Sequence, residues 1–153
     1  MTAPRPSGNL PGAGPLVASS LAVSLRMRRQ HTHDTAAELR LRRALRDLGL
    51  GYRVNRAPLP GIRRTADVVF VGARVAVYVD GCFWHGCPEH FVRPRANAAY
   101  WVPKIEANRA RDAETDAILV GAGWVAVHVW EHEDPVEAAQ RVVRIIGQRR
   151  RPR

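Results

Sequence analysis

The segment after Thr35 has the apolar spacing of an amphipathic helix. Its opening, Thr35-Ala-Ala-Glu38, has the form of a capping box, in which side chains bond the free N–H groups of a helix start. An apolar stripe then recurs at intervals of three and four residues, and Gly49 is expected to end the helix. Two uses of Glu38 remain open, as a helix cap or as a residue that faces an active site. The stripe consists of Leu41, Ala44, Leu45 and Leu48.

Strand-like segments follow this helix. Residues 52–55 predict a short strand. Residues 66–70 and 75–79 are almost wholly apolar, as expected of central strands buried on both faces, and residues 71–74 predict a tight hairpin between them. Asp67 interrupts the first apolar run, and a carboxylate at the head of such a strand is costly unless it is paired or bound to metal.

The second half of the chain predicts a helix, a strand and a final helix. Pro103 suits the first turn of a helix that continues to about Val120. Residues 124–130 alternate as a strand, and Asp134 caps a last helix that is expected to end at Gly147. The order helix, three strands, helix, strand, helix predicts an α/β fold with a mixed central sheet flanked by helices.

Composition divides the chain into three parts. Residues 1–24 are rich in Pro and Gly and predict a disordered lead, residues 25–148 form the folded domain, and residues 149–153 form a loose basic tail. A basic arm follows the lead and is either solvated or laid on DNA phosphates. This arm carries Arg26, Arg28 and Arg29.

A net charge of +10, most of it from arginine, favours nucleic acid as the partner. A membrane surface or codon bias toward arginine would give the same count. No apolar run approaches the roughly 20 residues that span a bilayer, and no segment has the form of an export signal. We therefore expect a protein of the cytoplasm that binds no membrane.

Two acids are expected to meet at one end of the hairpin. Asp67 begins one strand and Asp80 ends its partner, so antiparallel pairing brings their carboxylates together as an oxygen site for Mg²⁺. This arrangement resembles that of the PD-(D/E)xK nucleases, although no Lys follows the second acid. The alternative is two solvated aspartates at strand ends. His85 is the candidate for proton transfer because its ordinary pKa is near neutral.

The loop after this strand carries ligands suited to zinc. Both cysteines of the chain, Cys82 and Cys87, lie there with His90, and His132 leaves the end of a later strand. Zn²⁺ in a structural role favours a closed tetrahedron of such ligands. The alternative is two ordinary thiols with surface histidines.

Three aromatic residues flank the same loop. Phe83, Trp84 and Trp101 lie outside the apolar strands. They either pack over the loop or insert between base pairs of DNA.

About two thirds of the chain, from Met27 to His132, resembles the very-short-patch-repair (Vsr) DNA mismatch endonuclease family. The Gly-Cys-Phe-Trp-His run is the most specific part of the resemblance. The matching pieces are Thr35-Ala-Ala-Glu38, Leu59-Pro-Gly61 before Asp67, Gly81-Cys-Phe-Trp-His85, Trp101-x-x-Lys104-Ile105, Asn108-x-x-x-Asp112, and Gly123-Trp124 leading to Val129-Trp130-Glu131.

The resemblance implies a fold like that of type II restriction endonucleases, with a structural zinc loop. It implies Mg²⁺-dependent nicking on the 5′ side of the T in T:G mispairs left by deamination of 5-methylcytosine. Asp67 would hold the magnesium, and His85 would be the base, with Glu38 and Asp112 beside it. Phe83, Trp84 and Trp101 would form an intercalating wedge. The protein would be a bacterial, nucleoid-associated monomer, with mismatch-repair proteins as candidate partners.

The chain departs from the family pattern in two respects. Val79-Asp80 stands where the family has Thr-His, so one catalytic histidine is replaced by an acid. His90 and His132 stand where zinc-binding cysteines are expected. We therefore keep two alternatives: a restriction-type or repair nuclease of the same fold with another specificity, and a non-catalytic zinc domain that binds DNA.

Overall fold

The computed structural model describes residues 34–82, 85, 87–89 and 97–150. The first helix is α2, Ala36–Asp47, and Thr35 caps it by accepting the N–H of Glu38 at 3.3 Å. The carboxylate of Glu38 accepts the N–H of Asp34 at 2.9 Å. Only one of the two bonds of a capping box is therefore made as predicted, because the acid bonds the residue before the cap.

Gly49 ends α2, as predicted. Its φ of +78° lies in the left-handed region, where glycine carries no Cβ penalty. The N–H of Gly49 bonds the carbonyl of Arg46, and the N–H of Leu50 bonds that of Leu45. These two bonds form a Schellman motif, which satisfies carbonyls that the helix end leaves free.

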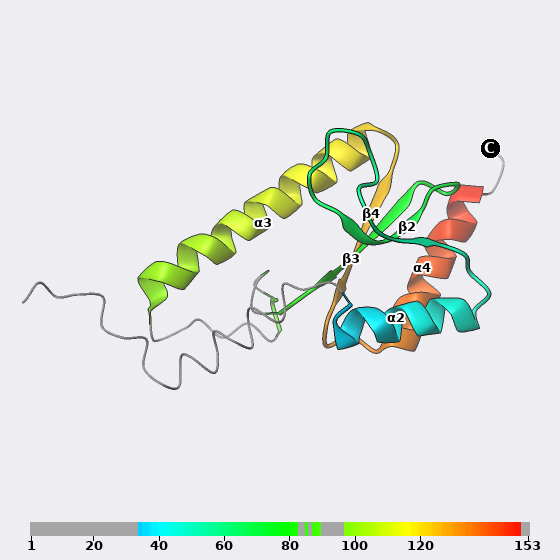
Figure 1. Cartoon of the computed structure of the whole chain (residues 1–153), viewed down its shortest axis with the longest axis horizontal. Coiled ribbons are helices and arrows are strands. Elements are labelled where there is room, and N and C mark those ends of the chain that lie inside the picture. Colours follow the sequence, from blue (N-terminus) through cyan, green and yellow to red (C-terminus); the bar gives the residue numbers. More distant parts are fainter. Residues whose placement is uncertain (1–33, 83–84, 86, 90–96, 151–153) are drawn as a thin grey trace, which may run out of the picture. The chain divides into compact units, whose positions relative to one another are not determined.

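Four strands form one sheet in the order β1-β2-β3-β4 (Figure 1). They are β1 (Arg53–Arg56), β2 (Ala66–Phe70), β3 (Val75–Asp80) and β4 (Val125–Trp130). The first two neighbouring pairs are antiparallel and β3 pairs with β4 in parallel, so the predicted mixed sheet is confirmed. The predicted hairpin at residues 71–74 is also present, closed by a bond from the N–H of Arg74 to the carbonyl of Val71.

Strands β2 and β3 are buried on both faces, as the apolar runs predicted, whereas β1 is mostly exposed. On one face the valines of β3 and β4 pack with α2 and with α4, Pro135–Arg150. On the other face Tyr78 and Ala76 pack with Leu119 of α3, Ala98–Gly121. Side chains alternate along a strand, so the side chains of β3 and β4 that do not point to α2 and α4 point to α3.

Helix α3 begins five residues before the predicted start at Pro103. The N–H groups of Tyr100 and Trp101 bond the carbonyl of Asn97, so the helix is already closed there. Pro103 is inside the helix. It removes only the bond to the carbonyl of Ala99, and alanine-rich sequence on either side favours the helix.

Helix α4 continues past its predicted end at Gly147 to Arg150. Arg149, expected in a loose tail, donates to the carbonyls of Ala73 and Gly123. These bonds tie the helix end to the β2–β3 hairpin and to the end of α3, which explains why one glycine does not stop the helix. Residues 151–153 of the predicted tail and the lead of residues 1–24 lie outside the described part.

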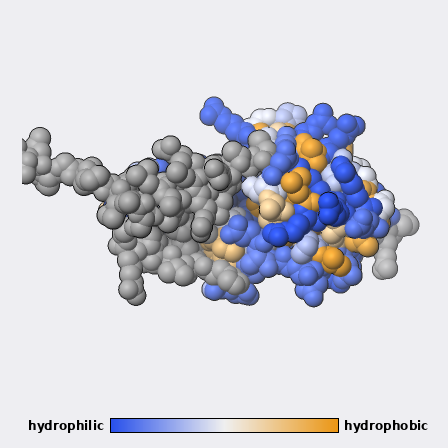
Figure 2. Space-filling model, turned by 60° about the horizontal axis from the view of Figure 1, so that its bottom comes forward, coloured by the Kyte–Doolittle hydropathy of each residue, from blue (hydrophilic) through white to orange (hydrophobic). Residues whose placement is uncertain are grey.

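The described surface is mostly hydrophilic, with apolar side chains scattered among charged ones (Figure 2). Such scattered exposure is ordinary for a folded domain. None of the described helices is both long and apolar enough to cross a membrane.

Candidate functional site

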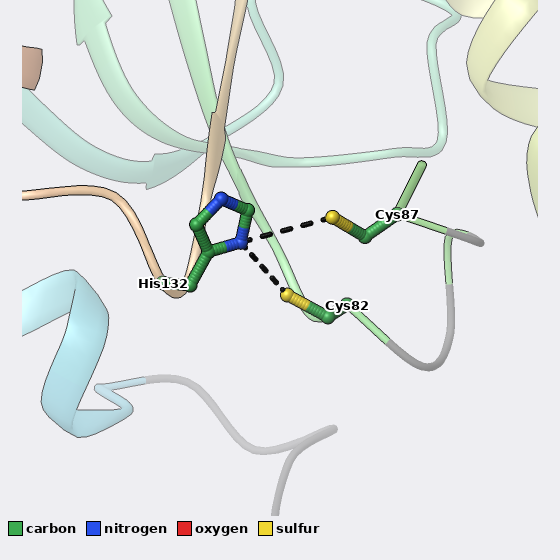
Figure 3. A group of neighbouring side chains, drawn as sticks. All are labelled: Cys82, Cys87 and His132. Carbon is green, nitrogen blue, oxygen red and sulfur yellow. Dashed lines mark hydrogen bonds between the residues drawn. The ribbon is translucent and has the colours of Figure 1, made fainter. Parts of the chain in front are cut away.

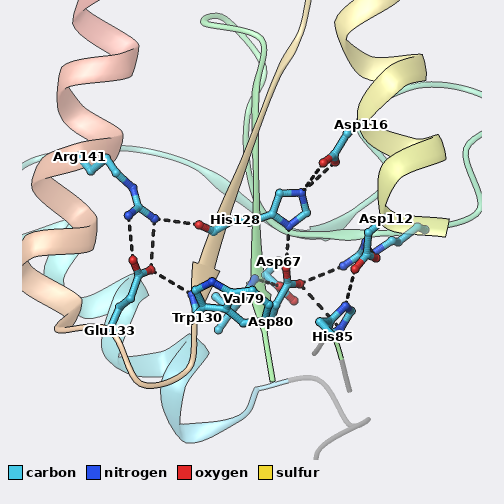
Figure 4. Close-up of polar contacts among 11 residues, drawn as sticks. Asp67, Val79, Asp80, His85, Asp112, Asp116, His128, Trp130, Glu133 and Arg141 are labelled. Atoms are coloured by element: carbon cyan, nitrogen blue, oxygen red, sulfur yellow. Dashed lines mark hydrogen bonds and ion pairs between the residues drawn. The ribbon is translucent and has the colours of Figure 1, made fainter. Parts of the chain in front are cut away.

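Polar side chains meet where β3 and β4 end, on the face of the sheet toward α3 (Figure 4). The two strands are parallel, so their carboxyl ends lie at the same edge. The register pairs Tyr78 with His128 and Asp80 with Trp130. Asp112 and Asp116 approach the same edge from α3, one helical turn apart and therefore on one side of the helix.

Asp80 is the buried centre of this site, with 3% of its surface exposed. One carboxylate oxygen lies 3.1 Å from a guanidinium nitrogen of Arg64, and the other lies 2.6 Å from Nδ1 of His128. Nε2 of His85 lies 3.8 Å from the first oxygen. Arg64 and His128 thus contact this buried carboxylate on two sides.

Asp112 orients His85. Its Oδ2 lies 2.5 Å from Nδ1 of the imidazole, and its other oxygen accepts from Arg64. A carboxylate on Nδ1 favours the tautomer in which Nδ1 carries the proton and Nε2 keeps its lone pair. In this tautomer the free nitrogen of His85 faces Asp80.

Asp80, His85 and Asp112 each offer a ligand atom, and these atoms lie within 4.8 Å of one another. They line a cavity of about 520 Å³. The cavity is also lined by Cys87, Pro88, Arg109, Ala113, Asp116, His128 and Trp130.

Asp67 lies close to this centre, but its carboxylate is engaged with the backbone. Its Oδ2 accepts the N–H of Val79 at 2.6 Å. Burial raises the pKa of Asp67 to about 7, and the negative charges of Glu38 and Asp80 add to the rise. The N–H of Val79 and the charge of Arg64 act in the opposite direction. In the absence of a bound cation, this carboxyl therefore keeps its proton in mildly acidic solution and loses it as the pH rises through about 7.

Glu38 has contacts on both sides of its position. It caps α2 through Asp34, and its charge acts on Asp67. Arg42 binds Glu38 at 3.4 Å and Asp34 at 2.5 Å, so the buried acid has a cation beside it.

His128, Asp116 and Arg64 are site residues that we did not predict. Burial lowers the pKa of His128, but the hydrogen bonds and charges of Asp80 and Asp116 outweigh it and raise that pKa to about 9. His128 is the polar member of a strand whose alternate residues are apolar, and Asp116 follows Asp112 by one helical turn. Those two spacings were available in the sequence. Nothing in the loop around Arg64 signals its role.

Three of the four predicted zinc ligands lie in the described part of the chain, and they come together there (Figure 3). Nδ1 of His132 lies 3.2 Å from Sγ of Cys82 and 3.7 Å from Sγ of Cys87. Burial raises the pKa of the Cys82 thiol to about 12, with Cys87 contributing. The three ligand atoms lie within 4.8 Å of one another. The fourth predicted ligand, His90, lies outside the described residues.

Trp101 lies in the first turns of α3 with its ring edge-on to Tyr100, at 4.8 Å between centroids. Lys104 lies over Tyr100 at 4.1 Å. The other predicted DNA contacts fall outside the described residues. They are Phe83, Trp84, Arg26, Arg28 and Arg29.

Comparison with known proteins gives one consistent family. The family model described as DNA mismatch endonuclease Vsr matches residues 20–90. The type II nicking enzyme V.NaeI of Lentzea aerocolonigenes is 40% identical over 122 residues, which cover 78% of this chain and 74% of the relative. The type II nicking enzyme V.XorIIP of Xanthomonas oryzae is 40% identical over 111 residues, covering 70% and 77%.

The DNA mismatch endonuclease Vsr of Escherichia coli is 37% identical over 109 residues, which cover 71% of this chain and 68% of that protein. The matched portions include the strands and loop that hold Asp67, Asp80 and His85. With this similarity and a pocket of paired acids and histidine at a sheet edge, the chain belongs to the Vsr family of DNA mismatch endonucleases.

Proposed function

We propose that this endonuclease nicks one strand of duplex DNA on the 5′ side of the T in T:G mispairs that arise from deamination of 5-methylcytosine. The observation that carries the proposal is the His85–Asp112 pair beside buried Asp80 and Asp67, in a chain of the Vsr family. A binding domain without catalysis has no use for so many acids beside a DNA phosphate.

Hydrolysis of a phosphodiester needs a base that takes a proton from the attacking water, and His85 is suited to that role. Asp112 holds Nδ1 at 2.5 Å, which leaves Nε2 to accept a proton from water. The water oxygen then forms a bond to phosphorus, and the bond from phosphorus to the leaving oxygen breaks. Asp112 stabilises the imidazolium that results.

Magnesium fits the acids of the site. Asp67 lies partly buried near Asp80 and Glu38. Burial is the main cause of its raised pKa, and an excess of negative charge from those two acids adds to it. A hard divalent cation prefers carboxylate oxygens and relieves such an excess. Asp67 and Asp80 would hold the ion, with Asp112 close by. When bound, it supplies charge stabilisation for the phosphate.

The sheet and its acids support a restriction-endonuclease-like fold of the PD-(D/E)xK type, with Asp67 as the first acid and Asp80 as the second. Zinc fits the second cluster, because two buried sulfurs and an imidazole nitrogen converge there. Cys82, Cys87 and His132 would hold it with His90. Its role would be structural, joining the loop after β3 to the residues after β4.

The names of the relatives favour one alternative. Several are type II nicking enzymes, so a nick at a different mispair or sequence context is the second candidate.

Trp101, with Phe83 and Trp84, would be the wedge that makes use of weaker stacking at a mispair.

One assay separates these two candidate functions. Duplexes labelled on either strand carry T:G, A:T or G:C at one position, in several flanking sequences, and are incubated with and without Mg²⁺. We expect a nick in the T strand of T:G duplex that requires Mg²⁺. Equal cleavage of matched duplex would contradict the mismatch specificity, and equal cleavage in a chelator would contradict the metal mechanism.

A further inference from the structure

We propose that His128, held in place by Asp116, is a positioning residue that fixes the carboxylate of Asp80 in the active site. This role goes beyond the base and the metal ligands, and it rests on the proposed nuclease function. It gives a purpose to two residues that the mechanism above does not use.

The contacts form a chain of alternating charge. Nε2 of His128 lies 2.8 Å from both oxygens of Asp116, and its Nδ1 lies 2.6 Å from Asp80. A side chain that bonds a carboxylate through each ring nitrogen cannot rotate without losing both bonds. The direction of the second Asp80 oxygen is therefore set from α3, across the strand β4.

The ring of Tyr78 supports this arrangement from within the sheet. It is stacked with the ring of His128 at 5.4 Å and 18°, and the guanidinium of Arg64 lies over it at 4.3 Å. The two groups that bind Asp80 thus both rest on one buried aromatic ring. Parallel pairing of Tyr78 with His128 enforces the stacking, since neighbours in register point to the same face.

The consequence concerns which oxygen of Asp80 is available. His128 takes Oδ2, so Oδ1 is directed toward Arg64 and Nε2 of His85. Without this partner, the Asp80 carboxylate would be held through Oδ1 alone, and Oδ2 would no longer be fixed. Loss of a partner that orients an active-site ligand commonly lowers activity or metal affinity by about 10-fold to 100-fold.

The test uses His128→Ala, Asp80→Asn and the double variant, with Glu114→Gln as a matched control. Glu114 is an exposed acid of α3 that does not line the pocket. Single-turnover nicking of T:G duplex, the duplex Kd and the melting temperature are measured for each. We expect His128→Ala to slow nicking about 10-fold to 100-fold, with an unchanged Kd.

The double variant decides whether His128 acts through Asp80. If it does, the double variant nicks no more slowly than Asp80→Asn alone, because the two changes remove one interaction. His128→Asn, whose side-chain amide can still donate to Asp80, should recover part of the rate, as should added imidazole with His128→Ala. Additive losses, or a rate for His128→Ala within about twofold of the parent, would overturn the proposal.

A measurement without DNA keeps this inference separate from the proposed specificity. In ¹⁵N-labelled protein, both ring N–H protons of His128 should be protected from exchange with water. The Nδ1 signal should move in Asp80→Asn and the Nε2 signal in Asp116→Asn, while Glu114→Gln leaves both in place. Ring protons that exchange freely in the parent would overturn the positioning role even in a protein that nicks T:G duplex. If the parent nicks no duplex, the proposed function fails, and these signals still decide the contact.

Discussion

For Asp67 we expect opposite effects on stability and on catalysis. Its carboxylate is buried near Glu38 and Asp80, which raises its pKa to about 7. A folded-state pKa above the unfolded value stabilises the protein at low pH, and this stabilisation is lost as pH rises through the folded pKa. The negative charge with which Asp67 would bind a metal ion therefore lowers the stability of the fold when no metal is bound.

Asp67→Asn should reveal that cost. In magnesium-free buffer we expect the variant to unfold at higher urea than the parent at pH 8, by on the order of 4 kcal/mol at most. The difference should vanish below about pH 3, where the parent carboxyl is protonated in both states. Nicking should fall at least ~100-fold, since a charge-stabilising group is lost. A parent that is more stable than the variant at pH 8 would contradict the buried-charge argument.

His85 and Asp112 form a hydrogen-bonded pair in the candidate site. His85→Ala should slow nicking by roughly 10²-fold to 10⁴-fold, the range for loss of a general base. Asp112→Asn should also slow it strongly, because an amide no longer holds the tautomer in which Nε2 is free. Glu106→Gln changes an exposed acid of the same helix and serves as control. Parent-like rates for His85→Ala under single-turnover conditions would remove it as the base.

Among the elements, the loop after β3 is predicted to depend on a zinc ion held by its cysteines. Cys87 is buried, at 1% exposure, beside Cys82 and His132. Cys87→Ser should lower both the zinc content and the melting temperature, because metal binding contributes directly to folding. Glu89→Gln is the matched control variant. Glu89 is exposed, and its carboxylate lies 3.4 Å from Nε2 of His132. Parent protein purified without chelators and lacking stoichiometric zinc would contradict a structural zinc site.

The end of α4 gives a prediction from one arginine and its neighbour. Arg149 and its neighbour Arg150 are both exposed, and Arg149 bonds two backbone carbonyls. Arg149→Ala should lower the free energy of unfolding by about 1 kcal/mol, the usual net value of such bonds. Arg150→Ala removes the same charge and should change stability little. Equal effects of the two changes in urea unfolding would show that charge, rather than the bonds, is responsible.

For the whole molecule, a net charge of +10 predicts affinity that depends on salt. Replacing Arg26, Arg28 and Arg29 by Gln should weaken binding to T:G and matched duplexes by similar factors. The slope of log Kd against log salt should fall by about one for each phosphate that the arm no longer neutralises. Deleting residues 1–25 removes a single arginine and should leave the mismatch preference intact. A selective loss of T:G binding would assign specificity to the arm.

The sequence by itself determined the elements and their order. Caps, apolar periodicity and turn residues act within a few positions, so Thr35, Gly49 and the hairpin at residues 71–74 could be recognised locally. The unbroken apolar runs also predicted strands buried on both faces. The family motif then singled out His85, Asp67 and Asp112 for the site.

Only the tertiary structure decided which partners these residues have. Arg64 reaches Asp80 and Asp112 from a loop, and Arg149 reaches the carbonyls of Ala73 and Gly123, because long side chains bridge segments that no local pattern relates. The parallel pairing of β3 with β4 brings His128 beside Tyr78 and Asp80, although about fifty residues separate them along the chain. Local sequence specifies propensity and periodicity, whereas register and packing set the distances on which charge and chemistry depend.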